Sequence, residues 1–209
     1  MPDTKIPIDN NIRYVALGDS YTICEGATWQ ESWPYILTER LNKSGIPIKL
    51  IANPSRTGWT SQNLIDNELP IFDSSSPNFA TLLIGVNDWV QDVSEESFHK
   101  NLNFIIDHVQ KKIRSNKLVL ITIPDFSVTP DGPKYSKGRN ITKGISAFNK
   151  IIIDEAIKRN LKYVDIFPAS LKMKDDPELI SKDNLHPSAK EYAIWESLIY
   201  PVVYKVLKQ

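Results

Sequence analysis

The stretch Tyr14-Val15-Ala16-Leu17-Gly18-Asp19-Ser20-Tyr21 decides the fold of this chain. A short apolar run that is closed by glycine is typical of a buried strand. Ser20 is therefore expected just beyond the carboxyl end of a strand, at the edge where open α/β sheets bind ligands. A serine hydroxyl is a weak nucleophile by itself, so a catalytic Ser20 requires a base and a carboxylate from elsewhere.

The stretch Asp183-Asn184-Leu185-His186-Pro187 offers both groups near the other end of the chain. Of the three histidines, His99 and His108 fall at the flanks of a predicted long helix, where solvent exposure is expected. His186 instead precedes a proline at a predicted helix start, which favours it as the base. Asp183 lies three residues earlier, so its carboxylate can fold back to Nδ1 and leave Nε2 facing Ser20.

Four short blocks occur in order along the chain: Gly18-Asp19-Ser20-Tyr21, the lone Gly58, Gly85-Val86-Asn87-Asp88, and Asp183-x-x-His186-Pro187. Together they resemble the SGNH (GDSL) hydrolase superfamily, whose third and fourth blocks read G-x-N-D and D-x-x-H. Tyr21 departs from the family pattern, because leucine stands at that position in the family name.

The resemblance implies a serine esterase with a triad of Ser20, His186 and Asp183 and a covalent acyl-enzyme. It also implies that the backbone N–H groups of Ser20 and Gly58 and the amide of Asn87 bind the oxyanion. Gly58 suits this role because no side chain blocks the approach of the substrate. The family acts on carboxylic esters, and the compact chain favours a small or O-acetyl ester.

Apolar runs and helical periodicities alternate along the sequence, which indicates a parallel sheet with helices on both faces. The resemblance implies a three-layer α/β/α sandwich with a five-stranded, flavodoxin-like sheet. The predicted strands span 12–17, 46–52, 80–84, 117–123 and 162–167. The predicted helices start near 32, 61, 94, 141 and 187, and the second of them is expected to close at Pro70.

Two predicted loops matter for the site. Residues 21–26 are expected to form a loop that carries the nucleophile. Residues 124–137 contain three prolines and one glycine and are longer than a minimal connection. Loops of that kind often act as lids or binding loops.

Aromatic residues beside the blocks are candidates for the pocket wall, namely Tyr21, Trp59 and Trp89. Flat rings of this kind suit an acyl chain or a sugar, although packing into the core is an equal alternative for the tryptophans. Asp19 and Asp88 are expected to order their loops through hydrogen bonds to the backbone.

The 209 residues fit a single domain over 1–209 without a linker. A hydrophobic fraction of 41% and a charged fraction of 24% are ordinary for a soluble globular protein. The formal net charge of zero argues against binding to nucleic acid or anionic membranes. The lone Cys24 excludes an internal disulfide, and the absence of a signal-like or 18-residue apolar run predicts a cytoplasmic protein without a membrane span.

Other chemistries find no support in the sequence. It contains no phosphate-binding glycine motif, no zinc-ligand set and no G-x-S-x-G elbow, so neither a metal nor a cofactor is expected. The expected partner is a small-molecule ester, and the oligomeric state has no sequence signal. Two alternatives stay open: a lysophospholipase or thioesterase, and a catalytically silent protein that binds esters or carbohydrates.

Overall fold

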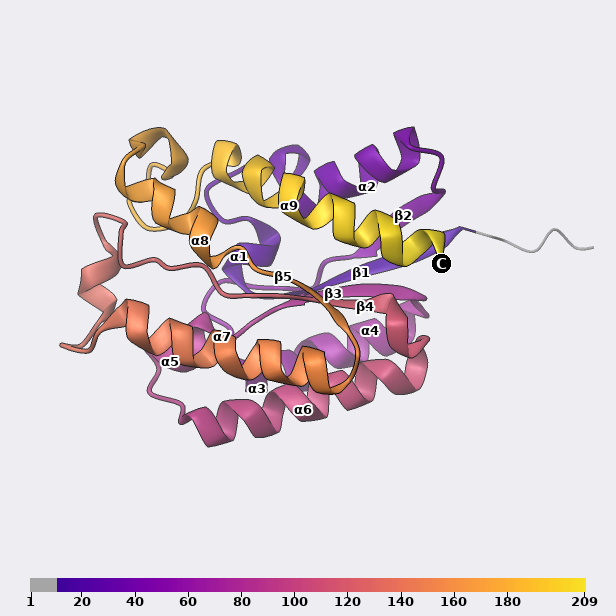
Figure 1. Ribbon diagram of the computed structural model, residues 1–209, viewed down its shortest axis with the longest axis horizontal. Helices are drawn as coiled ribbons and strands as arrows, with labels where there is room; N and C mark the ends of the chain where they lie inside the picture. The colour runs from indigo at the N-terminus through magenta and orange to yellow at the C-terminus, as the bar shows by residue number, and fades with distance from the viewer. Residues whose placement is uncertain (1–10) are drawn as a thin grey trace, which may run out of the picture.

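One parallel sheet organises the molecule, with its strands in the order β2-β1-β3-β4-β5 (Figure 1). The structure is a computed structural model and describes residues 11–209. This strand order is that of the flavodoxin-like α/β folds, which confirms the predicted architecture. Its strands are β1 (Ile12–Gly18), β2 (Ile48–Ala52), β3 (Phe79–Leu83), β4 (Leu118–Ile121) and β5 (Lys162–Val164).

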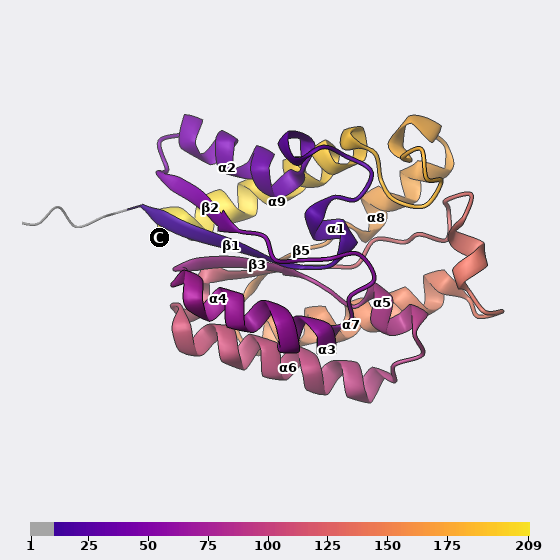
Figure 2. The same ribbon diagram turned by 180° about the vertical axis from the view of Figure 1, so that it is seen from behind.

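Helices cover both faces of the sheet (Figures 1 and 2). On one face lie α2 (Trp33–Lys43), α8 (Phe167–Ser170) and α9 (Ala189–Lys208). On the other lie α3 (Ser61–Asn63), α4 (Leu69–Ser75), α6 (Glu95–Lys112) and α7 (Ile141–Lys158). Two short helices follow strands β1 and β3 at one end of the sheet, α1 (Ser20–Ile23) and α5 (Val86–Val90).

Single turns of helix complete the connections. The 3-10 turns are η1 (Trp29–Glu31), η3 (Ser115–Lys117), η4 (Gly132–Tyr135), η5 (Leu171–Lys174) and η6 (Pro177–Leu179). A π-helical turn, η2 (Leu64–Glu68), joins α3 to α4.

Strand β1 is the centre of the core. It pairs with both β2 and β3, and its residues 14–17 are completely buried. A strand covered on both faces can be apolar without alternation, which is why this run was recognisable in the sequence. The one polar group within it, the Tyr14 hydroxyl, is hydrogen-bonded to Thr81 Oγ1 at 2.7 Å.

The predicted end of the second helix at Pro70 is wrong. The helical backbone runs on from α3 through the π-helical turn η2 into α4 and ends at Ser75. Pro70 falls in the first turn of α4, where a missing N–H breaks no hydrogen bond of that helix. A proline therefore marks the start of a helix here, although the sequence suggested an end.

The structure also corrects three predicted boundaries. Residues 20–23 form helix α1, within the segment predicted as a loop. Strand β2 begins at Ile48, two residues later than predicted, and so leaves Pro47 outside the strand. Strand β5 ends at Val164, because Asp165 Oδ1 turns back to accept hydrogen bonds from Thr122 Oγ1 and Phe167 N.

The two histidines of α6 are partly exposed, in line with the sequence prediction, but each is also bonded to a neighbouring helix. His108 Nε2 lies 3.0 Å from Asp73 Oδ1 of α4, and His99 Nε2 lies 2.9 Å from Glu155 Oε1 of α7. Each imidazole thus joins α6 to a neighbouring helix.

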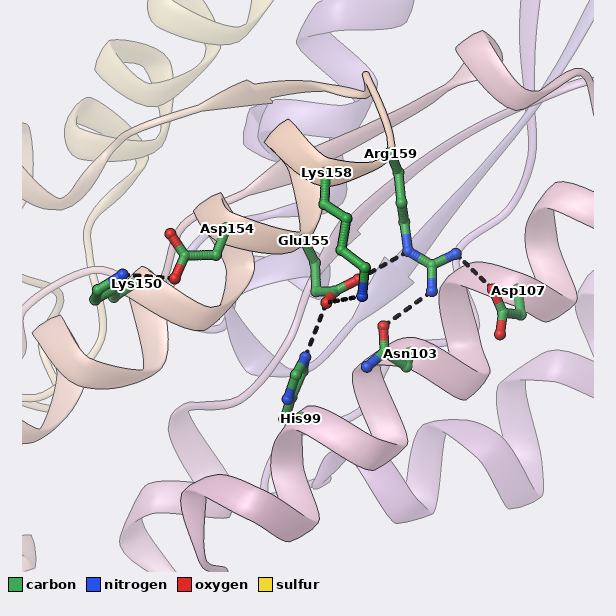
Figure 3. Close-up of polar contacts among 8 residues, drawn as sticks. All are labelled: His99, Asn103, Asp107, Lys150, Asp154, Glu155, Lys158 and Arg159. Carbon is green, nitrogen blue, oxygen red and sulfur yellow. Dashed lines mark hydrogen bonds and ion pairs between the residues drawn. The ribbon is translucent and has the colours of Figure 1, made fainter.

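Glu155 is the centre of a charged network between α6 and α7 (Figure 3). Its side chain is only 3% exposed and contacts His99, Lys158 Nζ at 2.9 Å and Arg159 Nε at 2.9 Å. Burial alone would raise the pKa of Glu155, but the hydrogen bonds from these three side chains outweigh burial and lower the pKa to about 2. Arg159 in turn donates to Asn103 of α6.

We expect Glu155→Gln to lower the free energy of unfolding by about 2–4 kcal/mol at pH 7, because the neutral amide loses the attraction between the buried carboxylate and Lys158 and Arg159. Because folding lowers the pKa of Glu155, its charge stabilises the fold at pH values above the pKa in the unfolded chain. This stabilisation is lost as the pH falls toward the pKa in the folded chain. The difference between variant and wild type should therefore shrink below about pH 4.5 in urea titrations.

The matched control is Asp154→Asn on the same helix, since Asp154 forms an exposed pair with Lys150 and should matter by less than about 1 kcal/mol. A difference for Glu155→Gln that is equal at pH 7 and below pH 4 would show that the charge of Glu155 does not stabilise the fold.

Candidate active site

Three polar side chains from distant parts of the sequence line one pocket at the carboxyl edge of the sheet. Ser20 comes from α1 after β1, Asn87 from α5 after β3, and His186 from the loop before α9. The chain leaves β1 for α2 on one face and β3 for α6 on the other (Figure 2). The pocket therefore lies at the topological switch point of the sheet, where α/β proteins of this kind bind ligands.

The residues on either side of Ser20 hold the turn that carries it. Asp19 caps α1, with its Oδ1 accepting a hydrogen bond from Tyr21 N at 3.0 Å. Gly18 is required by close packing, because a Cβ at this position would lie 2.1 Å from Thr22 Oγ1 and 2.3 Å from Leu83 O. The small residue lets α1 turn tightly over the end of β3 and leaves Ser20 at the pocket.

Asp183 and His186 are in direct contact. Asp183 Oδ2 lies 2.6 Å from His186 Nδ1, and Asp183 Oδ1 accepts from Ser181 Oγ and from the backbone N–H groups of Leu185 and His186. Burial opposes ionisation of this carboxyl, but the hydrogen bonds outweigh burial and hold the pKa of Asp183 well below its usual range. An ionised acceptor places the proton on Nδ1, so the neutral ring has Nε2 free to accept a proton.

Hydrogen bonds join the Gly58 loop to α5. Asn87 Nδ2 donates to Trp59 O at 3.0 Å, which fixes the amide and leaves its second N–H unused by this bond. Gln91 Nε2 donates to Gly58 O at 3.0 Å. Gly58 itself has a φ of +83°, a backbone conformation that favours glycine. The sequence analysis missed Gln91, and no motif marks it.

Asp88 orders the same region from below, as the sequence predicted. It is fully buried and accepts hydrogen bonds from Ser61 N at 2.8 Å and Ser61 Oγ at 2.5 Å. Asn101 Nδ2 of α6 also donates to Ser61 Oγ. The start of α3, directly after the Gly58 loop, is thereby tied to both α5 and α6.

The wall of the pocket differs from the prediction. Tyr21 lines it, but Trp59 and Trp89 do not. Trp89 is 5% exposed and lies beneath the guanidinium of Arg139, whose Cζ is 3.9 Å from the ring centroid. The remaining wall consists of apolar and aromatic residues that the sequence analysis did not single out: Val86, Val90, Phe126, Tyr135 and Leu185.

The long segment between β4 and α7 supplies Phe126 and Tyr135 and is tied down at two places. Asp131 N donates to Asn184 O at 3.0 Å, beside His186. Arg139 Nη1 donates to Trp89 O at 2.8 Å and forms an ion pair with Asp92, which also pairs with Lys137. The segment thus forms a fixed side of the pocket.

Size alone would not locate this site. A larger concavity of about 790 Å³ lies at the opposite edge of the sheet and contains none of the block residues. The pocket at Ser20 has a volume of only about 70 Å³. Within residues 11–209, no helix combines the length and apolarity that crossing a bilayer demands.

A 2-1-3-4-5 sheet with polar groups gathered at its switch point defines a flavodoxin-like α/β protein. Residues 16–194 match the model of the GDSL-like lipase/acylhydrolase family. The chain belongs to this family, and the protein is therefore a carboxylic ester hydrolase.

Solved structures share the fold at low sequence identity. TesA is 18% identical with a TM-score of 0.71, covering 93% of this chain and 99% of its own. The esterase EstA from Pseudoalteromonas sp. is 21% identical with a TM-score of 0.72, covering 96% and 100%. The acetylxylan esterase Axe2 from Geobacillus stearothermophilus is 15% identical with a TM-score of 0.74, covering 92% and 94%. No curated protein sequence matches the chain significantly.

We expect Gly18→Ala to lower the free energy of unfolding by about 1–3 kcal/mol, since the new methyl group overlaps Thr22 and the Leu83 carbonyl. Urea denaturation measures this loss. Adding Thr22→Ala should restore only part of it, because the clash with the backbone of Leu83 persists. Wild-type stability of the single variant would contradict the close packing described above.

Proposed function

We propose that the protein cleaves small carboxylic esters through a Ser20–His186–Asp183 triad and a covalent acyl-enzyme. The observation that carries this proposal is that Ser20 and His186, from opposite ends of the sequence, line one narrow pocket. The contact between Asp183 and His186 Nδ1 supports it further, because it orients the imidazole as a general base.

In the proposed reaction His186 Nε2 removes the proton of Ser20 Oγ as the oxygen attacks the ester carbonyl. The tetrahedral intermediate collapses when His186 returns the proton to the leaving alcohol, and the acyl group stays on Ser20. Water then attacks the acyl-enzyme with His186 as base. Collapse of the second intermediate releases the acid and restores the serine.

Three donors are proposed to bind the oxyanion: the N–H groups of Ser20 and Gly58 and the amide of Asn87. Ser20 is the first residue of α1, so its N–H has no acceptor within the helix. The bonds from Asn87 to Trp59 O and from Gln91 to Gly58 O hold the other two donors in place. Loss of one such donor typically costs about 100- to 1000-fold in turnover.

The narrow pocket favours a short acyl group such as acetyl. Its volume of about 70 Å³ is far below the roughly 300–1,000 Å³ typical of pockets that enclose a drug-sized ligand. Phe126 and Tyr135 close one side of the pocket, and both belong to the segment that is tied to α5. The similarly folded Axe2 is named an acetylxylan esterase, so an acetyl ester is the substrate given for that enzyme.

The decisive experiment is labelling with a fluorophosphonate probe, which reacts with activated serines. We expect the wild-type protein to be labelled and folded Ser20→Ala to be unlabelled, with Ser197→Ala as an exposed-serine control that stays labelled. EstA, which shares the fold, was solved in a form inhibited by monoethylphosphonate.

Unchanged labelling of Ser20→Ala would reject the assigned nucleophile. A wild-type protein that binds esters without labelling or turnover would instead support the catalytically silent alternative.

A chain-length series of p-nitrophenyl esters tests the acyl preference. We expect kcat/KM for the acetate to exceed that for the octanoate by at least about 10-fold, because a longer chain does not fit the pocket. Tyr135→Ala should reduce this ratio by about 10-fold or more, since a few methylenes in an apolar pocket change kcat/KM by such factors.

Tyr163→Ala, on β5 and away from the pocket, is the control and should leave the ratio unchanged. A wild-type preference for long chains would favour the lysophospholipase or thioesterase alternative.

A further inference from the structure

Two carboxyl groups lie beneath the turn that carries Ser20. Glu68, the last residue of η2, is completely buried, and its Oε2 accepts a hydrogen bond from Gly18 N at 3.0 Å. Asp19 is also completely buried, and its Oδ1 accepts from Tyr21 N at 3.0 Å. The two backbone donors flank Ser20 on either side, so this acidic pair bounds the nucleophile turn.

Neither carboxyl group has the cationic partner or the full set of hydrogen-bond donors that a buried carboxylate requires. Asp19 Oδ2 and Glu68 Oε1 are buried without a hydrogen-bond partner. Among residues 11–209, no Lys, Arg or His forms an ion pair with either group, whereas the buried Glu155 pairs with the cations Lys158 and Arg159 and also contacts His99. A buried carboxylate without a cation or a full set of donors is strongly disfavoured against its neutral form.

The charged neighbours make ionisation harder still, because they are acidic. Burial is the largest cause that raises the pKa of Glu68 well above its usual range, and the negative charge of Asp19 adds to it. Burial likewise raises the pKa of Asp19, with a further contribution from Asp88 of α5. The hydrogen bonds from Gly18 N to Glu68 and from Tyr21 N to Asp19, and a contact of the Ser55 side chain with Glu68, act in the opposite direction but do not outweigh burial.

We propose that Glu68 is a positioning residue that works as a neutral carboxylic acid, holding the end of β1 and thereby the turn that carries Ser20. The proposal rests on the proposed function only where it concerns turnover. It assigns Glu68 no contact with substrate, because Glu68 does not line the pocket. Loss of its proton at alkaline pH places a buried negative charge beside the Asp19 carboxyl and disturbs the turn.

Stability and turnover respond to this proton in different pH ranges. The unfolded chain releases the proton near the ordinary pKa of glutamate, whereas the folded chain holds it to a higher pH. Between these two pKa values, wild type becomes less stable relative to a variant that cannot ionise. Its unfolding constant rises relative to that of the variant by up to about tenfold per pH unit. Turnover falls only above the folded value, where the native protein itself loses the proton.

Glu68→Gln tests the proposal because the amide has the shape of the neutral acid and keeps the acceptor for Gly18 N. Thermal unfolding and p-nitrophenyl acetate turnover are measured from pH 5 to pH 10. We expect kcat of Glu68→Gln within about twofold of wild type at pH 7 and a relative stability that increases with pH. At the alkaline end we expect kcat to fall less in the variant than in wild type, because only Asp19 can still ionise beside the turn.

The control is Glu155→Gln, whose wild-type carboxylate is ionised and paired with cations, so this variant should be less stable than wild type at every pH above about 5. If Glu68→Gln behaves in the same way, the neutral-acid proposal is overturned. A gain in stability without any change in the alkaline fall of kcat would overturn the positioning role. A wild-type protein without esterase activity would instead reject the proposed function, while the stability measurement would still decide the state of Glu68.

Discussion

The burial of strand β1 on both faces and both edges is the constraint on which the rest of the structure depends. With β2 on one side and β3 on the other, the completely buried residues 14–17 of β1 carry no polar side-chain group except the Tyr14 hydroxyl, which is bonded to Thr81. Right-handed connections then carry the chain from β1 to one face and from β3 to the other. The crevice between them is the one place at this edge where the turns after both strands can present polar groups to a ligand.

The environment of each acidic side chain near this framework decides its protonation state and its use. Asp183 accepts four hydrogen bonds, two of them from His186 through its backbone N–H and Nδ1, and is held as a carboxylate. Glu155 is equally ionised because cations surround it. Glu68 has a single backbone donor and an acidic neighbour, which favours the neutral acid. The same chemical group is thus held ionised by hydrogen bonds at Asp183 and by ion pairs at Glu155, and it is proposed to be an uncharged support at Glu68.

Family membership establishes ester hydrolysis, whereas the shape of the pocket comes from the packing of this chain. The groups proposed for the chemistry follow β1 and β3 or precede α9, on short turns. One side of the pocket, with Phe126 and Tyr135, comes instead from the long segment before α7, which Asp131 ties to Asn184 and Arg139 ties to α5. The proposed reaction therefore depends on the turns at the sheet edge, and the proposed acyl preference depends in part on how this segment packs.

The sequence by itself determined the features that depend on neighbours a few residues apart. The apolar run of β1, the Ser94 cap that starts α6, and the three-residue step that lets Asp183 reach His186 all follow from local geometry. The four blocks added the family and the strand order. Only the tertiary structure decided the partners of His99 and His108, the passage of a helix through Pro70, the pocket wall with Tyr135, and the places of Gln91 and Glu68. These depend on packing between elements far apart in the chain, which no local pattern of residues encodes.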